Sequence, residues 1–176
     1  MKKYFIATIL ILAIATTSIF AVPVTDNFTV TTTVAEIGLI KVTTASIGAN
    51  TLAAYNALTD FTTLAIDSPG TKTFSAFMTT LSNKRTGYNV KLSATAMTST
   101  VGSATSYINY TVGSNGQSVT TNGAATVTPV TVINVPSLTA ISGDSKAITL
   151  SVDATSFNAA VSGNYTGIVT FTFTAN

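Results

Sequence analysis

The chain has 176 residues, of which 46% are apolar and only 8% are charged. It contains no His and no Cys, which removes the usual general base, the thiol nucleophile and the usual transition-metal ligands, and excludes Ser-His-Asp catalysis within the chain. The 8 basic and 6 acidic residues include no basic cluster that could neutralise phosphates, so a nucleic-acid partner is disfavoured.

Residues 1–21 have the pattern of a secretory signal peptide. Lys2 and Lys3 give a positive start, an apolar run follows, and Ala21 is a small residue at the expected cleavage point. The apolar run is shorter than the roughly 20 residues that span a bilayer, so a retained membrane anchor is the less favoured alternative. We therefore expect an exported chain, residues 22–176, without stable membrane insertion, in the periplasm or at the cell surface of a bacterium.

Beyond residue 21, apolar residues alternate with Thr or Ser, which is the pattern of strands with one solvated face. The first such stretch places Phe28, Val30 and Val34 on one face. The last stretch, residues 165–175, places Val169, Phe171 and Phe173 on one face and threonines on the other. Between them we expect strands at residues 38–43, 61–66, 73–78, 88–97, 107–112, 126–135 and 146–153, and a short helix within residues 50–60.

Turn residues separate these stretches at intervals often near ten residues. The expected turns are residues 67–70, 82–87, 113–116, 122–123, 142–145 and 162–164. Pro129 interrupts the alternation of its stretch, which indicates a bulge or an edge strand. The spacing predicts an all-β protein, with residues 22–176 forming a single antiparallel β-sandwich domain.

Carboxylates are the remaining candidates for catalysis or metal binding. The six are isolated in sequence, and we expect them to cap turns and keep the surface soluble rather than to form a glycosidase pair. Two pairs could hold calcium, namely Asp60 with Asp67 and Asp144 with Asp153, although no loop has a dense pattern of oxygen ligands. We therefore expect no enzymatic activity and no cofactor.

The two terminal stretches of the exported chain are uncharged and alternating. Edge strands of this kind lack the usual protection against pairing with another chain, so one subunit could add a strand to the sheet of the next. Residues 22–34 would be the donated extension. The alternative, which the sequence leaves open, is that both stretches pair within one complete sandwich.

Two segments resemble a known family. "LSNKRTGYNVKLSATAM" (81–97) and "SGNYTGIVTFTFTAN" (162–176) are similar to segments of chaperone–usher fimbrial subunits, particularly the archaic and spore-coat-U-like branch. The resemblance implies an incomplete immunoglobulin-like fold and a periplasmic chaperone as a partner. It implies that Phe28, Val30 and Val34 belong to the donor extension, and that Val169, Phe171 and Phe173 lie beside the groove that it fills.

The sequence thus predicts an exported, non-catalytic structural subunit of a cell-surface assembly, which associates with copies of itself or with related subunits. A monomeric binding module for a glycan or a protein is the main alternative. Tyr107 would serve such a module, because it falls on the opposite face from Ile108 and Tyr110. A carboxylate-dependent hydrolase ranks last.

Overall fold

The computed structural model describes residues 27–176, and the predicted signal peptide lies outside them. The chain divides into two units, residues 1–34 and 35–176, which are described separately. In the first unit, residues 27–34 form no helix and no strand, so the strand expected at residues 28–34 is absent from the single chain. The second unit holds every helix and strand of the described residues.

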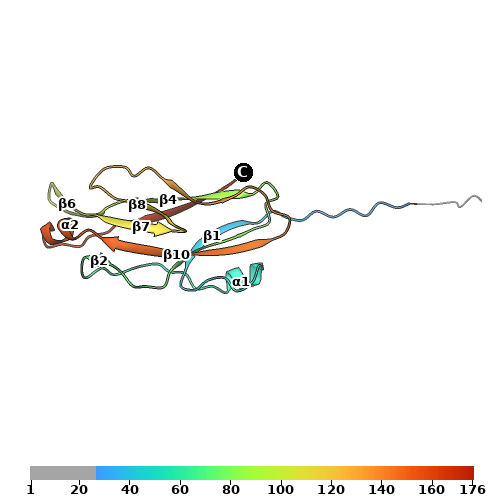
Figure 1. Cartoon of the computed structure of the whole chain (residues 1–176), viewed down its shortest axis with the longest axis horizontal. Coiled ribbons are helices and arrows are strands. Elements are labelled where there is room, and N and C mark those ends of the chain that lie inside the picture. The colour runs from blue at the N-terminus through green and yellow to red at the C-terminus, as the bar shows by residue number, and fades with distance from the viewer. Residues whose placement is uncertain (1–26) are drawn as a thin grey trace, which may run out of the picture. The chain divides into compact units, whose positions relative to one another are not determined.

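The second unit is all-β with two short helices (Figure 1). Its helices are α1 (Leu52–Asn56) and α2 (Ala154–Ala159). Its strands are β1 (Gly38–Thr43), β2 (Gly70–Thr71), β3 (Phe77–Ser82), β4 (Tyr88–Ala94), β5 (Met97–Val101), β6 (Ala104–Ile108), β7 (Tyr110–Ser114), β8 (Gln117–Thr120), β9 (Val130–Val135), β10 (Ser142–Val152) and β11 (Val169–Ala175).

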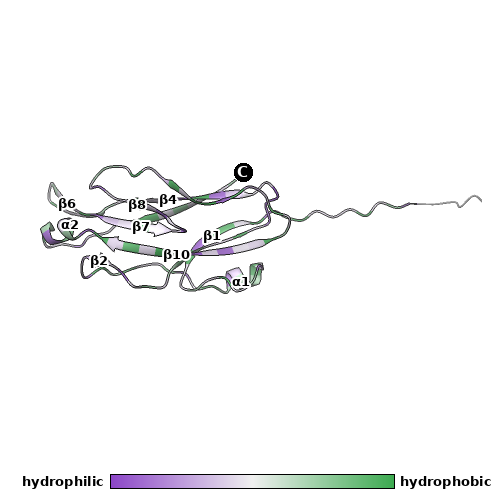
Figure 2. Cartoon of the chain, in the orientation of Figure 1, coloured by the Kyte–Doolittle hydropathy of each residue, from purple (hydrophilic) through white to green (hydrophobic). Residues whose placement is uncertain are grey.

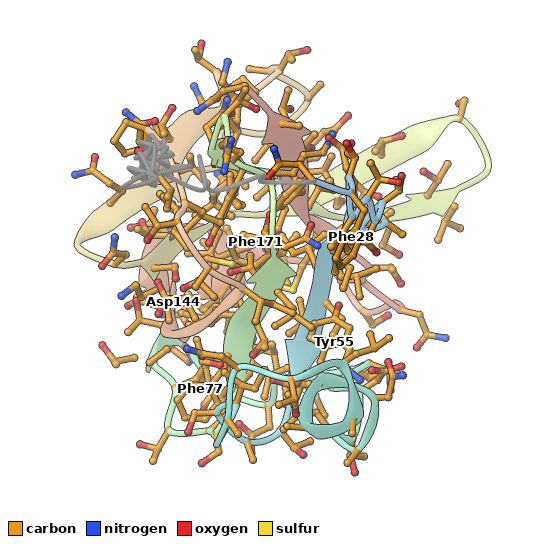
Figure 3. All side chains as sticks on the ribbon, turned by 90° about the vertical axis from the view of Figure 1, so that its right-hand side faces the viewer. Phe28, Tyr55, Phe77, Asp144 and Phe171 are labelled. Atoms are coloured by element: carbon orange, nitrogen blue, oxygen red, sulfur yellow. The ribbon has the colours of Figure 1, made fainter. Side chains whose placement is uncertain are left out.

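The strands form two main antiparallel sheets and one hairpin. The larger sheet has the order β1-β3-β10-β7-β8, with β2 also paired to β10, and the smaller sheet has the order β11-β4-β9. β10 is long enough to pair with β3 along its first half and with β7 along its second half. β5 and β6 form a separate hairpin, which projects beyond the sandwich (Figure 3).

The core lies between the two main sheets. The inner residues of β4 are fully buried, and they meet buried residues of β3, β7, β8 and β9. In β11 the threonines are exposed and the alternate apolar residues are half-buried, so the predicted orientation of this strand is confirmed. In β10, apolar residues alternate along the half that faces this core, after a hydrophilic stretch at residues 144–146 (Figure 2).

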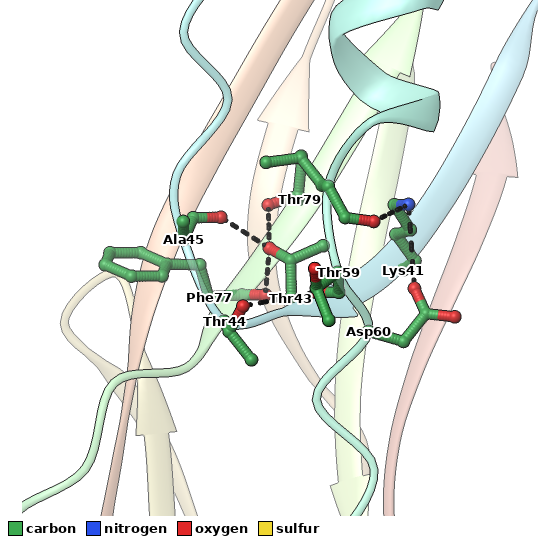
Figure 4. Close-up of polar contacts among 9 residues, drawn as sticks. Lys41, Thr43, Thr44, Ala45, Thr59, Asp60, Phe77 and Thr79 are labelled. Carbon is green, nitrogen blue, oxygen red and sulfur yellow. Dashed lines mark hydrogen bonds and ion pairs between the residues drawn. The ribbon is translucent and has the colours of Figure 1, made fainter.

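The outer face of the larger sheet is also covered, by residues 44–60, which include α1. Thr51 caps α1, since its side chain accepts a hydrogen bond from Ala54 N at 3.1 Å. Under this cover, the hydroxyl of Thr79 lies 2.8 Å from the hydroxyl of Thr43 (Figure 4). It also lies 2.8 Å from the hydroxyl of Ser145. These buried polar groups are paired with one another, so covering the sheet leaves them satisfied.

Several sequence predictions are corrected by the structure. Residues 142–145 are part of β10 rather than a turn, because they pair with β3 beneath the covering segment. Residues 61–66 form no strand, and the strand expected at residues 73–78 begins only at Phe77. The helix α2 was not expected, although Asp153 caps it by accepting a hydrogen bond from Ser156 N at 2.7 Å.

Other expectations are confirmed. The strand predicted at residues 38–43 is β1, and the helix expected within residues 50–60 is α1. β9 is an edge strand, Pro129 directly precedes it, and its register with β4 shifts between Val90 and Lys91.

Candidate functional site: an apolar groove beside an unpaired strand edge

β11 is an edge strand of the smaller sheet. In the part of the chain that the structure describes, its only strand partner is β4. Hydrogen bonds at the two ends of this pairing both involve even-numbered residues of the last segment. Ile168 O accepts from Thr95 N at 2.9 Å, and Asn176 N donates to Gly87 O at 3.1 Å. Because bonded and non-bonded residues alternate along an antiparallel pair, the even-numbered residues of β11 bond to β4.

The odd-numbered residues of β11 therefore direct their backbone groups away from β4. The N–H and C=O groups of Val169, Phe171, Phe173 and Ala175 lie along the free edge of the sheet. The side chains of the first three are half-buried and pack against the core, and Figure 3 shows Phe171 within the sandwich. A strand that added to this edge would thus bond to the residues whose side chains face inward.

Residues 61–66 provide the opposite border. The chain returns from the covering segment to the end of β1, where Phe61 N donates to Val42 O at 2.9 Å. Beyond this point residues 62–66 make no backbone hydrogen bond to any described residue. The half-buried side chains of Phe61, Leu64 and Ile66 nevertheless face the interior, and Phe61 contacts Phe74 with 5.8 Å between ring centroids.

An apolar groove of about 420 Å³ lies between these two borders. One border comes from residues 61–66, which follow β1 of the larger sheet and the covering segment, and the other from residues 165–171, which lead into β11 of the smaller sheet. The floor is formed by Phe74, Ala76, Met97, Tyr110, Val112, Ile148 and Leu150. The groove therefore opens the core to solvent along a line where neither β11 nor residues 62–66 pair with a described strand on the side that faces the groove.

The groove is closed at one end by Phe173. The ring of Phe173 stacks on Tyr88 with 4.8 Å between centroids, and the Tyr88 hydroxyl lies 3.0 Å from Thr80 Oγ1. On its other side the ring meets β1, where a Cβ at Gly38 would lie 2.9 Å from the ring. Gly38 thus allows the two sheets to close over Phe173, and the open part of the groove lies toward Val169.

Tyr110 stands at the floor of the groove. Its hydroxyl donates a long hydrogen bond, 3.4 Å, to Ile168 O beside β11. Burial raises the pKa of Tyr110 to about 12, so the phenol stays neutral across the physiological range. Gly167, next to this carbonyl, packs so tightly that a Cβ would lie 2.9 Å from Thr95 O.

The six residues predicted to mediate subunit contacts fall into two groups. Val169 and Phe171 line one border of the groove, and Phe173, on the same face of β11, lies at its closed end. Phe28, Val30 and Val34 belong to the first unit, where their side chains are 89%, 78% and 76% exposed. The sequence places Phe61, Leu64 and Phe74 in expected strands, but nothing in it shows that these segments stay unpaired and border a groove.

The carboxylates that could have formed a catalytic or metal site are engaged elsewhere. Asp60 pairs with Lys41 at 3.5 Å, Asp67 with Lys72 at 3.6 Å and Asp144 with Lys146 at 3.1 Å. Among residues 27–176, no three acidic side chains lie close enough together to bind a metal ion.

The hydrogen bond from Ser156 N lowers the pKa of Asp153, and the hydrogen bond from Ser68 lowers that of Asp67. Both groups are therefore stabilised as carboxylates, which suits caps and ion pairs rather than proton transfer.

No family model, curated protein or solved structure matches this chain. In the described residues, no helix has the length and apolar character required to cross a membrane.

Proposed function

We propose that the protein is an exported, non-catalytic subunit of a fimbria-like surface assembly, and that its subunits join by strand addition. In this proposal the fold is an immunoglobulin-like sandwich that lacks one strand. The missing strand comes from residues 22–34 of another copy or of a related subunit. Before assembly, a periplasmic chaperone would occupy the same position.

The observation that carries the proposal is the free edge of β11 beside the apolar groove. Unpaired backbone groups on an edge strand are a ready template for another strand. Here they run along a groove whose floor is the protein core, so an added strand could form a hydrogen-bonded ladder and bury its side chains at the same time. A free edge beside a fully closed core would offer an added strand backbone hydrogen bonds but no place to bury its side chains.

The segment at residues 28–34 has the chemistry to fill this position. It is uncharged, its apolar residues are spaced by two or four, and the side chains of Phe28, Val30 and Val34 are exposed. Burial of each would contribute about 1.5–3 kcal/mol. Ordering the segment costs about 1–2 kcal/mol per residue, so the ladder along β11 is needed as well as the buried side chains.

Deletion of residues 22–34 tests the proposal. The exported full chain should form multimers that are visible as a ladder in SDS gels without boiling and as fibres by negative-stain microscopy. The deletion variant should remain a soluble, folded monomer. Multimers of normal length from the deletion variant would exclude strand donation by this segment.

A matched pair of substitutions refines this test. Phe28→Asp with Val30→Asp places charge on the face that would enter the groove, and we expect it to prevent assembly, because an unpaired charge is costly to bury. Thr29→Asp with Thr31→Asp places the same charge on the opposite face and should leave the multimers intact. Equal behaviour of the two variants would argue against insertion of the apolar face.

A second function, glycan binding by a monomer, is favoured by one observation. A hollow of about 510 Å³ lies on the outer side of the smaller sheet, lined by Tyr107, Thr98, Thr170 and residues 123–127. An aromatic ring among hydroxyl groups is suited to a sugar ring. A glycan array with the full chain and with Tyr107→Ala tests this function; sugar binding by a strictly monomeric protein would favour it over assembly.

A further inference from the structure

The three residues that link the donor segment to β1 are held by one asparagine. Asn83 Oδ1 accepts a hydrogen bond from Ile37 N at 2.6 Å, and Asn83 Nδ2 donates to Ala35 O at 2.8 Å. The backbone N–H of Asn83 also donates to Ile37 O at 3.1 Å. A single residue thus bonds to backbone groups of two alternate residues, as a neighbouring strand would.

Two further contacts reinforce this link. Ser82 Oγ donates to Ile37 O at 3.1 Å, and the ammonium group of Lys84 forms an ion pair with the Glu36 carboxylate. Residues 35–37 therefore continue the line of β1 beyond Gly38, although they form no strand. We call the side chains of Ser82, Asn83 and Lys84 the anchor.

The length of the donor segment makes such an anchor useful. Phe28 lies nine residues before Ile37, and β1 has six residues. At about 3.3 Å per residue, a segment that reversed direction at residues 35–37 would be long enough to run back along β1 and reach the groove of its own chain. Insertion into the same chain has no concentration dependence, so it would compete with assembly at every protein concentration.

A reversal at residues 35–37 would have to break the anchor contacts. A tight turn changes the direction of the backbone within four residues, and both Ala35 and Ile37 hold backbone hydrogen bonds to the one side chain of Asn83, which such a change would pull apart. The sequence of this link also contains no Gly, Pro, Asn or Asp, the residues that favour turns.

We infer that the anchor prevents the donor segment from folding back into the groove of its own chain, and so keeps the segment available to a second copy. The inference rests on the proposed function. It assigns Asn83, and secondarily Lys84, a role in selecting assembly between chains over closure within one chain.

The test compares the full chain with Asn83→Ala. Loss of two hydrogen bonds of ordinary strength corresponds to about a tenfold change in an equilibrium constant. We therefore expect at least a tenfold fall in the ratio of multimer to monomer, measured by gel filtration at two concentrations. The monomers that appear should unfold at a higher temperature than a variant that carries Asn83→Ala and lacks residues 22–34, because only the former can fill the groove.

The control is Asn50→Ala. Asn50 Oδ1 also accepts a backbone hydrogen bond, from Gly143 N at 3.0 Å, but it does not contact residues 35–37. This variant should assemble as the unchanged chain does. If Asn83→Ala fails to fold, Asn83→Asp serves in its place, since it keeps the acceptor for Ile37 N and loses the donor to Ala35 O; it should shift the ratio in the same direction by a smaller factor.

The outcomes distinguish failure of the proposed strand addition from failure of the role inferred for the anchor. If the unchanged chain and the Asn83 variants give the same multimers, the anchor has no selective role and strand addition stands. If the variant monomers are no more stable than those lacking residues 22–34, the segment does not enter its own groove and the inference fails. If the unchanged chain is itself a monomer whose properties do not depend on residues 22–34, the proposed function fails and the inference fails with it.

Discussion

The two long seams of the sandwich, where the edges of the larger and smaller sheets meet, are built differently. At the first seam β8 faces β9, and the chain passes directly from one to the other through residues 121–129. Asn115 Nδ2 donates across this seam to Val132 O at 2.7 Å, and Val119 and Val132 are buried. The second seam runs between residues 61–66 and 165–171 and contains the groove.

The difference shows what the second seam lacks. The hydrogen bond that joins the floor of its groove to one border, from the Tyr110 hydroxyl to Ile168 O, is 3.4 Å long, whereas the bond from Asn115 to Val132 O at the first seam is 2.7 Å long. Its inward-facing border residues, such as Leu64 and Val169, are half-buried, whereas Val119 and Val132 at the first seam are buried. The first seam is thus satisfied within one chain, while the second has an apolar floor, a free backbone edge and no strand to complete it.

Proline substitutions in β11 should give the largest effects, because they separate the two edges of one strand. Thr170→Pro removes an N–H that bonds to β4 and should destabilise the fold by about 3 kcal/mol or more. Val169→Pro removes an N–H that points to the open seam, so the protein should still fold but should not form multimers. Thermal unfolding and gel filtration measure both effects; equal destabilisation by the two prolines would contradict the assigned edge.

Matched valine truncations should show the same contrast in the side chains. Val132→Ala, at the closed seam, should lower the free energy of unfolding by about 2 kcal/mol, because a fully buried side chain loses two methyl groups. Val169→Ala, at the open seam, should cost about half as much in the monomer, because the side chain is only half-buried. Urea unfolding of monomeric protein checks both values; equal losses would mean that the open seam is already packed.

Part of the fold could be predicted from the sequence. How well each strand was predicted depends on how many of its faces are buried. β4 and β11 show a clear period of two, because each has one face toward the core and the other toward solvent, and the sequence predicts both. β3 is buried on both faces, by the core and by residues 44–60, so its apolar residues do not alternate and its start was misplaced. The groove border at residues 61–66 was predicted as a strand but has no partner to pair with.

Some features had no signal in the sequence. The residues 142–145, Ser-Gly-Asp-Ser, have turn composition, and only the tertiary cover over β10 makes a strand there favourable. The role of Asn83 depends on a contact between residues 46 positions apart, and nothing local distinguishes it from an ordinary turn residue. The helix α2, by contrast, could have been found from the capping position of Asp153.

The hydrogen bond across the closed seam should contribute a smaller amount. Asn115 has a positive φ of 51°, so Asn115→Ala would introduce backbone strain in addition to the loss of the bond. Asn115→Gly removes only the bond, and we expect it to cost about 1 kcal/mol, with Asn115→Ala costing more. Unfolding by urea measures the two values, and a glycine variant as stable as the unchanged protein would mean that this bond does not hold the seam.

The hydrogen bond from Tyr110 to Ile168 O should contribute least at neutral pH, because it is long and the groove beside it is open. We expect Tyr110→Phe to change the free energy of unfolding by only a few tenths of a kcal/mol near pH 7. The difference should appear in alkali. Burial raises the pKa of the folded phenol from 10.0 to about 12, so its contribution to stability is complete below pH 10 and is lost as the pH rises toward 12. Unfolding curves at pH 7 and pH 11 should therefore show that Tyr110→Phe loses less stability in alkali than the unchanged chain; parallel losses would mean that solvent already reaches the hydroxyl through the groove.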